Sequence, residues 1–271
     1  MNDPIAFIGG GNMASAIIGG LLGQGYSASQ IHVVEPFDEA RQKLQASFGI
    51  AAQPAPGPTL ALATLVVWAV KPQTFKDAAL QTGAHTARAL HLSVAAGITS
   101  DSIARWLATE RIVRAMPNTP ALIGKGITGV FARPAVTQVD RKAVQKVIAT
   151  TGDWLWLDSE AQLDAVTALS GSGPAYVFYF LEAMTEAGAQ MGLTREQAHK
   201  LAVATFIGAG ELARASTEPP EVLRQRVTSK GGTTHAAITS MEVNQMKALF
   251  VQAMLAAQVR AGEMGKAFGD D

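Results

Sequence analysis

The chain changes character at the stretch Ser170-Gly171-Ser172-Gly173-Pro174-Ala175. Before it, short apolar runs typical of strands alternate with amphipathic runs typical of helices, whereas after it almost every segment has a helical pattern. Pro174 suits the first turn of a helix, where a missing N–H costs nothing, and Ser172 can cap that turn. Free N–H groups at a helix start also attract anions. The stretch is therefore either a tight helix–helix turn or part of a binding site.

A second stretch rich in small residues favours the binding-site interpretation. It reads Ser229-Lys230-Gly231-Gly232-Thr233-Thr234 and lies in the same helical half of the chain. Glycines let another group approach the backbone closely, and a helix start with free N–H groups attracts an anion.

The composition excludes several classes of function. The chain has 271 residues, of which 48% are hydrophobic, so a substantial core in one large or two ordinary domains is expected. The formal net charge of +0 argues against binding to nucleic acid or to an anionic membrane. The chain has no cysteine, and its five histidines lack metal-ligand spacing, so we predict no disulfide and no metal site.

The apolar segments do not indicate export or membrane insertion. Residues 5–22 are apolar but carry no basic n-region before them, and glycines interrupt the run. Residues 60–70 form an apolar run that is too short to span a bilayer. We therefore predict a cytoplasmic location.

The N-terminal segment carries a dinucleotide-binding pattern. Residues 5–8 suit a buried parallel strand and lead into Gly9-Gly10-Gly11-Asn12-Met13-Ala14, which a helical run at 15–22 follows. In this GxGxxA pattern Gly9 makes the tight turn, Gly11 lets the pyrophosphate approach the backbone, and Ala14 allows close packing of helix on strand. The helix N-terminus then faces the phosphates.

Glu35 bears on the choice of cofactor. It ends a second predicted strand, 31–34, and stands 24 residues past Gly11, close to the offset expected for a ribose-binding acid. A carboxylate there accepts from the ribose 2′-OH and repels a 2′-phosphate, so this rule alone favours NAD(H). Arg41, on the following helix, could moderate the preference because arginine pairs well with phosphate. The alternative is that Glu35 is a solvated strand end.

Strand and helix patterns continue to alternate through the first half. Strands are predicted at 65–70, 90–95, 112–116, 126–131 and 154–157, and helices at 38–48 (with Asp38 as cap), after Pro72, and at 99–107 and 138–150. Lys71 and the small residues Ala95-Ala96-Gly97 follow strand ends, where such sheets bind ligands, although Lys71 could also be an ordinary exposed lysine. The pattern predicts a Rossmann-type doubly wound α/β domain over residues 1–158.

The remaining residues, 159–271, show no convincing strand pattern. Helices are predicted at 161–169, 174–191, 195–215, 220–227 and 243–262. So much apolar helix in one small domain exceeds what that domain can bury, and a homodimer interface is the natural outlet. We therefore predict an all-helical dimerisation domain.

Five motifs in order resemble one family, the pyrroline-5-carboxylate reductases, which catalyse the last step of proline synthesis. The motifs are Gly9 to Ala14, Ala69-Val70-Lys71-Pro72, Arg114-Ala115-Met116-Pro117-Asn118-Thr119-Pro120, Ser170 to Tyr176 and Ser229 to Thr234. The first is generic, but the last three together are specific, and the resemblance covers nearly the whole chain.

The resemblance implies a reaction and an assembly. The reaction is hydride transfer from NAD(P)H to the imine carbon of 1-pyrroline-5-carboxylate, which gives L-proline. The helical domains of two chains would interlock in a homodimer, and in some members dimers assemble further into a decamer. Family members often carry a small or basic residue at the position of Glu35 and favour NADPH, so this chain departs from the family there.

The resemblance also assigns site residues. The cofactor would be held by Gly9, Gly11, Asn12, Met13, Ala14, Glu35, Ala69, Val70, Lys71, Pro72, Ala95, Ala96, Gly97 and Asn118. The substrate carboxylate and ring would be held by Ser229, Gly231, Gly232, Thr233, Thr234 and Ser172. Thr234 would reach the imine nitrogen and is the predicted catalytic residue.

The chemistry distinguishes this family from two alternatives. Imine reduction needs no strong general base, because hydride adds to a carbon made electrophilic by protonation of the nitrogen. A β-hydroxyacid dehydrogenase must deprotonate an alcohol, typically with a lysine near the middle helix, but this chain has no lysine between Lys146 and Lys200. A non-enzymatic nucleotide-binding regulator would bind cofactor and turn over neither an imine nor a hydroxyacid.

Overall fold

The computed structural model describes residues 3–269, which form two compact units. The sheet unit comprises the chain up to Ser172 together with the segment from Ala257 onward, and the helical unit comprises residues 173–256. The predicted functional division between residues 158 and 159 stays a prediction, because a division by packing need not coincide with one by function.

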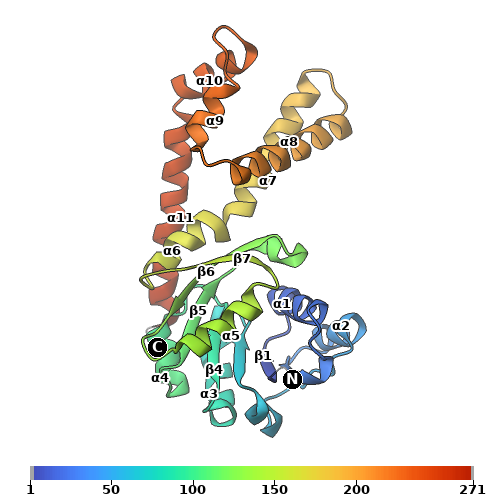
Figure 1. Cartoon of the computed structure of the whole chain (residues 1–271), viewed down its shortest axis with the longest axis vertical. Coiled ribbons are helices and arrows are strands. Elements are labelled where there is room, and N and C mark those ends of the chain that lie inside the picture. The colour runs from blue at the N-terminus through green and yellow to red at the C-terminus, as the bar shows by residue number, and fades with distance from the viewer. Residues whose placement is uncertain (1–2, 270–271) are drawn as a thin grey trace. The chain divides into compact units, whose positions relative to one another are not determined.

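The sheet unit is built on seven strands in the order β2-β1-β3-β4-β5-β6-β7 (Figure 1). All neighbouring strands are parallel except β5 and β6, which run antiparallel. The strands are β1 (Ile5–Ile8), β2 (Ile31–Val34), β3 (Leu65–Trp68), β4 (Leu90–Ser93), β5 (Ile112–Met116), β6 (Gly126–Ala132) and β7 (Gly152–Trp156).

Helices cover both faces of this sheet. Strands β1, β3 and β4 are therefore buried on both sides. One core joins Phe7 and Val67 to apolar residues of α1, α2 and α5, and a second joins Trp68 to Phe75 of α3 and Ile103 of α4. The helices are α1 (Asn12–Gly23), α2 (Asp38–Phe48), α3 (Pro72–Thr86), α4 (Ser100–Leu107), α5 (Gln138–Ile148) and α6 (Gln162–Val166), with short turns η1 (Ala28–Gln30), η2 (Pro58–Leu62), η3 (Thr119–Ile123) and η4 (Thr167–Gly171). The prediction of a doubly wound α/β domain is confirmed.

The helical unit begins with a helix pair. Gly188 of α7 packs so closely on Ala198 of α8 that a Cβ at Gly188 would lie 2.5 Å from the Ala198 Cβ. Phe250 of α11 makes edge-on contacts with the rings of Tyr176 and Phe180, at centroid distances of 5.8 and 5.4 Å. The helices are α7 (Gly173–Gln190), α8 (Arg195–Ala215), α9 (Pro220–Arg226), α10 (Thr233–Val243) and α11 (Met246–Gly269), of which the last continues into the sheet unit.

Several local predictions were wrong. Residues 233–243 form the separate helix α10, which the sequence hides because its N-cap, Gly232, offers no side-chain cap and its first two residues are threonines. Asp38 does not cap α2, because Phe37 occupies the cap position. The stretch around Ser170 is not a tight turn: its first residues lie in the π-helical turn η4, which follows α6 directly.

The described part of the chain, residues 3–269, contains no helix that is long and apolar enough to cross a membrane.

A buried histidine lies in the second core. The Trp68 Nε1–H donates to His91 Nδ1 at 3.0 Å, and the two rings stack at a centroid distance of 5.9 Å. Burial is the main cause that lowers the pKa of His91 to about 4, and Arg111 adds to it. His91 is therefore neutral at neutral pH, with its proton on Nε2, because Nδ1 accepts.

We expect this histidine to make the fold less stable in acid. Because the folded-state pKa of His91 is below its ordinary value, the unfolded chain binds the extra proton first, so stability falls as the pH drops from about 6.5 toward about 4. The loss should reach roughly 3 kcal/mol. Urea unfolding at several pH values in this window tests this against His91→Gln, which can keep an acceptor for Trp68 but does not titrate. Equal pH slopes for both proteins would contradict the assignment.

Candidate active site

The β1–α1 turn is held tightly by its neighbours. Gly9 has a φ of +95°, and a Cβ on it would lie 2.6 Å from the carbonyl oxygen of Ala69. Its N–H donates to the carbonyl of Val34 at 2.8 Å. Only glycine fits this position without strain, because the left-handed conformation and the backbone of the β3 end both exclude a side chain.

The start of α1 beyond that turn is open. Gly11 is the N-cap of α1 and makes no side-chain cap hydrogen bond, and no atom lies within 4 Å of the position a Cβ would take. Asn12 is exposed, Met13 is half-buried and Ala14 is fully buried against the sheet. Uncapped backbone N–H groups beside open space fit the pyrophosphate of a dinucleotide.

Glu35 is buried, which excludes a solvated strand end. It is 6% exposed, and its two carboxylate oxygens accept from the N–H groups of Gly10 at 2.7 Å and Phe37 at 2.9 Å. The Arg41 guanidinium is also engaged: its Nη1 donates to the carbonyls of Glu35 and Pro36, and its Nη2 pairs with Asp38. Glu35 thus ties the fingerprint turn to the end of β2, and Arg41 closes the β2–α2 turn.

The other cofactor candidates follow the carboxyl ends of β3, β4 and β5, which are neighbours in the sheet (Figure 1). Ala69 and Val70 follow β3, Lys71 is the exposed N-cap of α3, and Pro72 is the first residue of that helix. Ala95, Ala96 and Gly97 follow β4, and Gly97 has a φ of +71°. The Asn118 Oδ1 accepts from the N–H of Ile127 at 3.0 Å, which leaves its amide nitrogen for a ligand.

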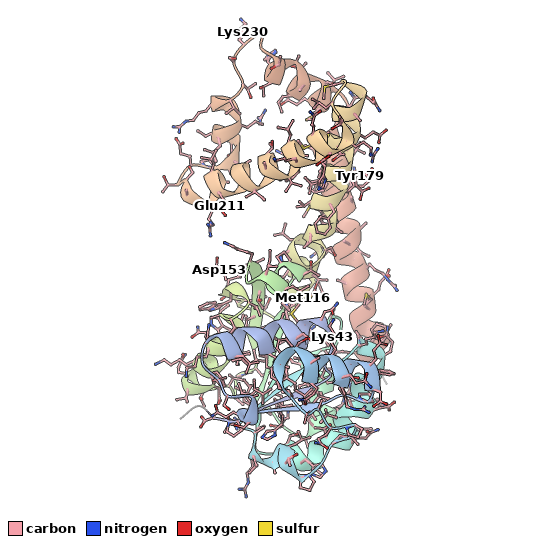
Figure 2. The ribbon with its side chains drawn as sticks, turned by 90° about the vertical axis from the view of Figure 1, so that its right-hand side faces the viewer. Lys43, Met116, Asp153, Tyr179, Glu211 and Lys230 are labelled. Atoms are coloured by element: carbon pink, nitrogen blue, oxygen red, sulfur yellow. The ribbon has the colours of Figure 1, made fainter. Side chains whose placement is uncertain are left out.

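The substrate candidates, apart from Ser172, lie in the helical unit. Gly232 is the N-cap of α10 and has no side-chain cap, and its N–H donates to the carbonyl of Ser229 at 3.0 Å. Gly231 has a φ of +78°, and Thr233 and Thr234 form the first turn of the helix. Figure 2 labels Lys230 on the loop that leads into this turn. In the sheet unit, the Ser172 N–H donates to the carbonyl of Thr167 at 2.8 Å.

Comparison with known proteins gives this geometry a context. Residues 160–264 match the family model for pyrroline-5-carboxylate reductase dimerisation, and residues 4–97 match the family described as NADP oxidoreductase coenzyme F420-dependent. The pyrroline-5-carboxylate reductase of Pseudomonas aeruginosa is 45% identical over 99% of this chain and 100% of its own length. The chain belongs to the pyrroline-5-carboxylate reductase family.

Further relatives and solved structures agree with this assignment. The pyrroline-5-carboxylate reductase of Escherichia coli K12 is 36% identical over 98% of this chain and 100% of its own length. The structure of the Coxiella burnetii reductase is similar with a TM-score of 0.91 at 37% identity, covering 98% of this chain and 100% of that one. The Plasmodium falciparum reductase, solved with NADP bound, has a TM-score of 0.86 at 28% identity and covers 97% of this chain and 98% of that one.

Family membership confirms the predicted activity class. A pyrroline-5-carboxylate reductase is an NAD(P)H-dependent oxidoreductase of proline biosynthesis, and the resemblance indicated by the five motifs is borne out over the full length. The dehydrogenase and regulator alternatives are set aside. The match at 160–264 is to the dimerisation domain of the family, so this chain carries the domain through which such reductases associate.

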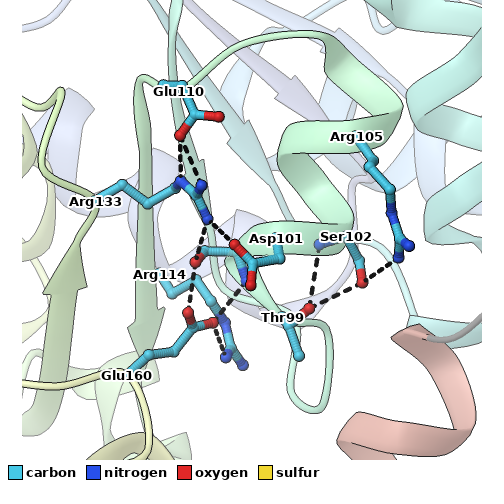
Figure 3. A network of polar contacts seen from close by, with 9 residues as sticks. Thr99, Asp101, Ser102, Arg105, Glu110, Arg114, Arg133 and Glu160 are labelled. Atoms are coloured by element: carbon cyan, nitrogen blue, oxygen red, sulfur yellow. Dashed lines mark hydrogen bonds and ion pairs between the residues drawn. The ribbon is translucent and has the colours of Figure 1, made fainter.

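Sequence reasoning missed one group of polar residues in the sheet unit of this reductase. Glu160 joins Arg114 of β5 to Ser100 of α4. Figure 3 shows Glu160 beside Arg114 in this network. The group borders a cavity of ≈ 770 Å³ that Arg105 and Lys266 also line. The sequence signal for this group was that Arg114 opens the motif Arg114-Ala115-Met116-Pro117-Asn118-Thr119-Pro120, which spans β5 and the loop after it.

Proposed function

We propose that this chain reduces 1-pyrroline-5-carboxylate to L-proline with NADH or NADPH. The supporting observation is the family assignment over the whole chain, joined to an open, uncapped helix start behind a GxGxxA turn. When bound, the reduced cofactor would supply a hydride to the imine carbon, and the electron pair of the C=N bond would pass to the protonated nitrogen.

Positioning is the main task of the protein in this reaction. Holding the two rings face to face can supply about 7–11 kcal/mol. We assign the cofactor to the α1 start and the strand ends. We assign the substrate carboxylate to the N–H groups of Thr233 and Thr234, since a helix N-terminus favours an anion, with Gly231 and Gly232 leaving room for it to approach. The Thr234 hydroxyl would hydrogen-bond the ring nitrogen. The substrate role of Ser172 stays a prediction from the family resemblance.

The direct test is the loss of NADH or NADPH absorbance after 1-pyrroline-5-carboxylate is added to pure protein. Oxidation of either cofactor with formation of proline is the expected result. Protein that binds nucleotide but oxidises neither cofactor would exclude this substrate.

We propose a preference for NADH over NADPH, with Glu35 as its cause. Its carboxylate is fixed at the end of β2, and the Arg41 guanidinium is already bound to two carbonyls and to Asp38, so it is poorly placed to pair with a 2′-phosphate. The NADP in the Plasmodium reductase shows that a relative accepts the phosphorylated form.

We expect Glu35→Ser to shift the preference toward NADPH. The substitution removes the charge that repels a 2′-phosphate and should change the ratio of kcat/KM for the two cofactors by about tenfold. The ratio is the informative quantity, because loss of the contacts to Gly10 and Phe37 weakens both cofactors alike. Glu39→Ser, which removes an exposed carboxylate four residues later, in α2, is the control. An unaltered ratio of kcat/KM for the two cofactors would show that Glu35 only holds the β1–α1 turn against the end of β2.

We propose a homodimer formed through residues 159–271, in line with the dimerisation family at 160–264. Many large apolar side chains of the helical unit are exposed in the single chain, among them Phe178, Tyr179, Leu201, Ile207 and Leu212. Figure 2 labels Tyr179 on α7. Such side chains are expected to be buried in an interface with a second copy of the chain. Whether dimers assemble into a decamer and whether the enzyme is cytoplasmic stay predictions from the sequence.

A further inference from the structure

The carboxylate of Glu160 collects three donors from two distant elements. Its Oε1 accepts from Arg114 Nη1 at 2.6 Å (Figure 3). The same oxygen accepts from the backbone N–H of Ser100 at 2.6 Å, and Oε2 accepts from the Ser100 hydroxyl. Glu160 stands just before α6, Arg114 lies within β5, and Ser100 is the first residue of α4. One side chain therefore fixes the relative placement of three elements.

The ion pair between Glu160 and Arg114 lies where an unpaired arginine charge would be costly. Arg114 is 8% exposed, and among the described residues its Nε has no hydrogen-bond partner. Its Nη1 forms an ion pair with Glu160 at 2.6 Å. Removing the partner of a buried charge is much more disruptive than removing an exposed one. The N–H of Ser100 lies in the first turn of α4 and has no acceptor within its own helix, so the Glu160 carboxylate satisfies it. A carboxylate is also favourable at a helix N-terminus.

Each of the three elements leads to a group that we assign to the site. The start of α4 follows the loop Ala95–Gly97 of the proposed cofactor site. β5 runs into the loop that carries Asn118, and the segment that begins at Glu160 ends at Ser172.

Close packing makes that last segment a rigid connection. A Cβ on Gly129 of β6 would lie 2.8 Å from a methyl group of Val166, and a Cβ on Gly171 would lie 2.6 Å from the Met116 Cε. The segment is thus seated on β5 and β6 along its length, with little space to shift independently of them.

We propose that Glu160 is a positioning residue for hydride transfer, which it serves by setting the Ala95–Gly97 loop and Ser172 relative to each other. It acts through Ser100 and Arg114 and touches neither substrate nor cofactor. The proposal rests on the proposed function.

The test variant is Glu160→Gln, which keeps the size of the side chain and removes its charge. We expect kcat with 1-pyrroline-5-carboxylate to fall about tenfold or more, because small misplacements of reacting groups are costly. We also expect a larger primary isotope effect on kcat with 4-deuterated cofactor, because a misplaced hydride makes its transfer more rate-limiting. The Kd for the cofactor, measured by fluorescence, should change little.

Glu110→Gln is the matched control. Glu110 pairs with Arg133 at the rim of the same network, but its side chain is 61% exposed and does not contact Ser100 or Arg114. It should leave kcat and the isotope effect unchanged.

The isotope effect distinguishes a positioning role from a loss of stability. Partial unfolding lowers the amount of active enzyme but leaves the isotope effect of the folded fraction unchanged. If Glu160→Gln does not fold, Ser100→Ala, which removes one donor, should show a smaller change in the same direction. An unchanged isotope effect in the folded variant would overturn the proposal. Absence of turnover in the unsubstituted protein would instead contradict the proposed function.

Discussion

Gly11→Ala is expected to weaken NADH binding by roughly tenfold to a hundredfold while leaving the free energy of unfolding unchanged. Gly11 has an extended backbone conformation that any residue adopts, and no atom lies within 4 Å of the added methyl group. The fold therefore tolerates alanine. In the complex the pyrophosphate would come against this backbone, so the methyl group would displace it from the N–H groups that bind it.

Gly9→Ala is the matched variant, two residues earlier in the same turn. Its methyl group would meet the Ala69 carbonyl oxygen at 2.6 Å, and its φ of +95° is strained for alanine. We expect it to lose both cofactor binding and about 2 kcal/mol or more of stability. Fluorescence titration with NADH and urea unfolding of both variants separate the two effects. Normal NADH affinity in Gly11→Ala would show that the fingerprint turn does not hold the cofactor.

The fold was predictable where local pattern decides structure. The buried runs at Ile5–Ile8 and Leu65–Trp68 and the glycines between strand and helix indicated parallel strands, and the sheet confirms them. Boundaries were less accurate. α1 begins at Asn12 rather than Ser15 because the fingerprint glycine itself caps the helix, and α10 was missed because glycine and threonine at its start are weak helix formers.

The site was predictable only in part, because some of its contacts join residues far apart in the sequence. The position of Glu35 suggested a ribose contact, but its bond to Gly10, 25 residues earlier, could not be foreseen. Glu160 drew no attention, since its partners Arg114 and Ser100 lie 46 and 60 residues away. The stretch from Ser229 to Thr234 stood out by its small residues, but its role as the substrate motif came from the resemblance.

Thr234→Ala is expected to lower kcat by roughly tenfold to a hundredfold and to leave the Kd for NADH unchanged, since one polar contact to a reacting group is worth about 1–3 kcal/mol. The hydroxyls of Thr185 and Thr205 donate to the carbonyls of Leu181 and Leu201, one helical turn earlier, at 2.7 and 2.8 Å. Thr234 stands in the first turn of α10, where no such helical carbonyl precedes it, and within residues 3–269 its hydroxyl has no hydrogen-bond partner. It is thus available to the ring nitrogen of the substrate.

Two further variants decide whether this hydroxyl acts in the reaction. Thr234→Ser keeps the oxygen and should recover most of the kcat lost in the alanine variant, whereas Thr205→Ala removes a hydroxyl that bonds within its own helix and should leave kcat intact. Steady-state rates with 1-pyrroline-5-carboxylate, with NADH affinity measured separately, distinguish the cases. Full turnover in Thr234→Ala would remove the residue from the mechanism, and the backbone N–H groups of α10 would then remain as the contribution of this motif.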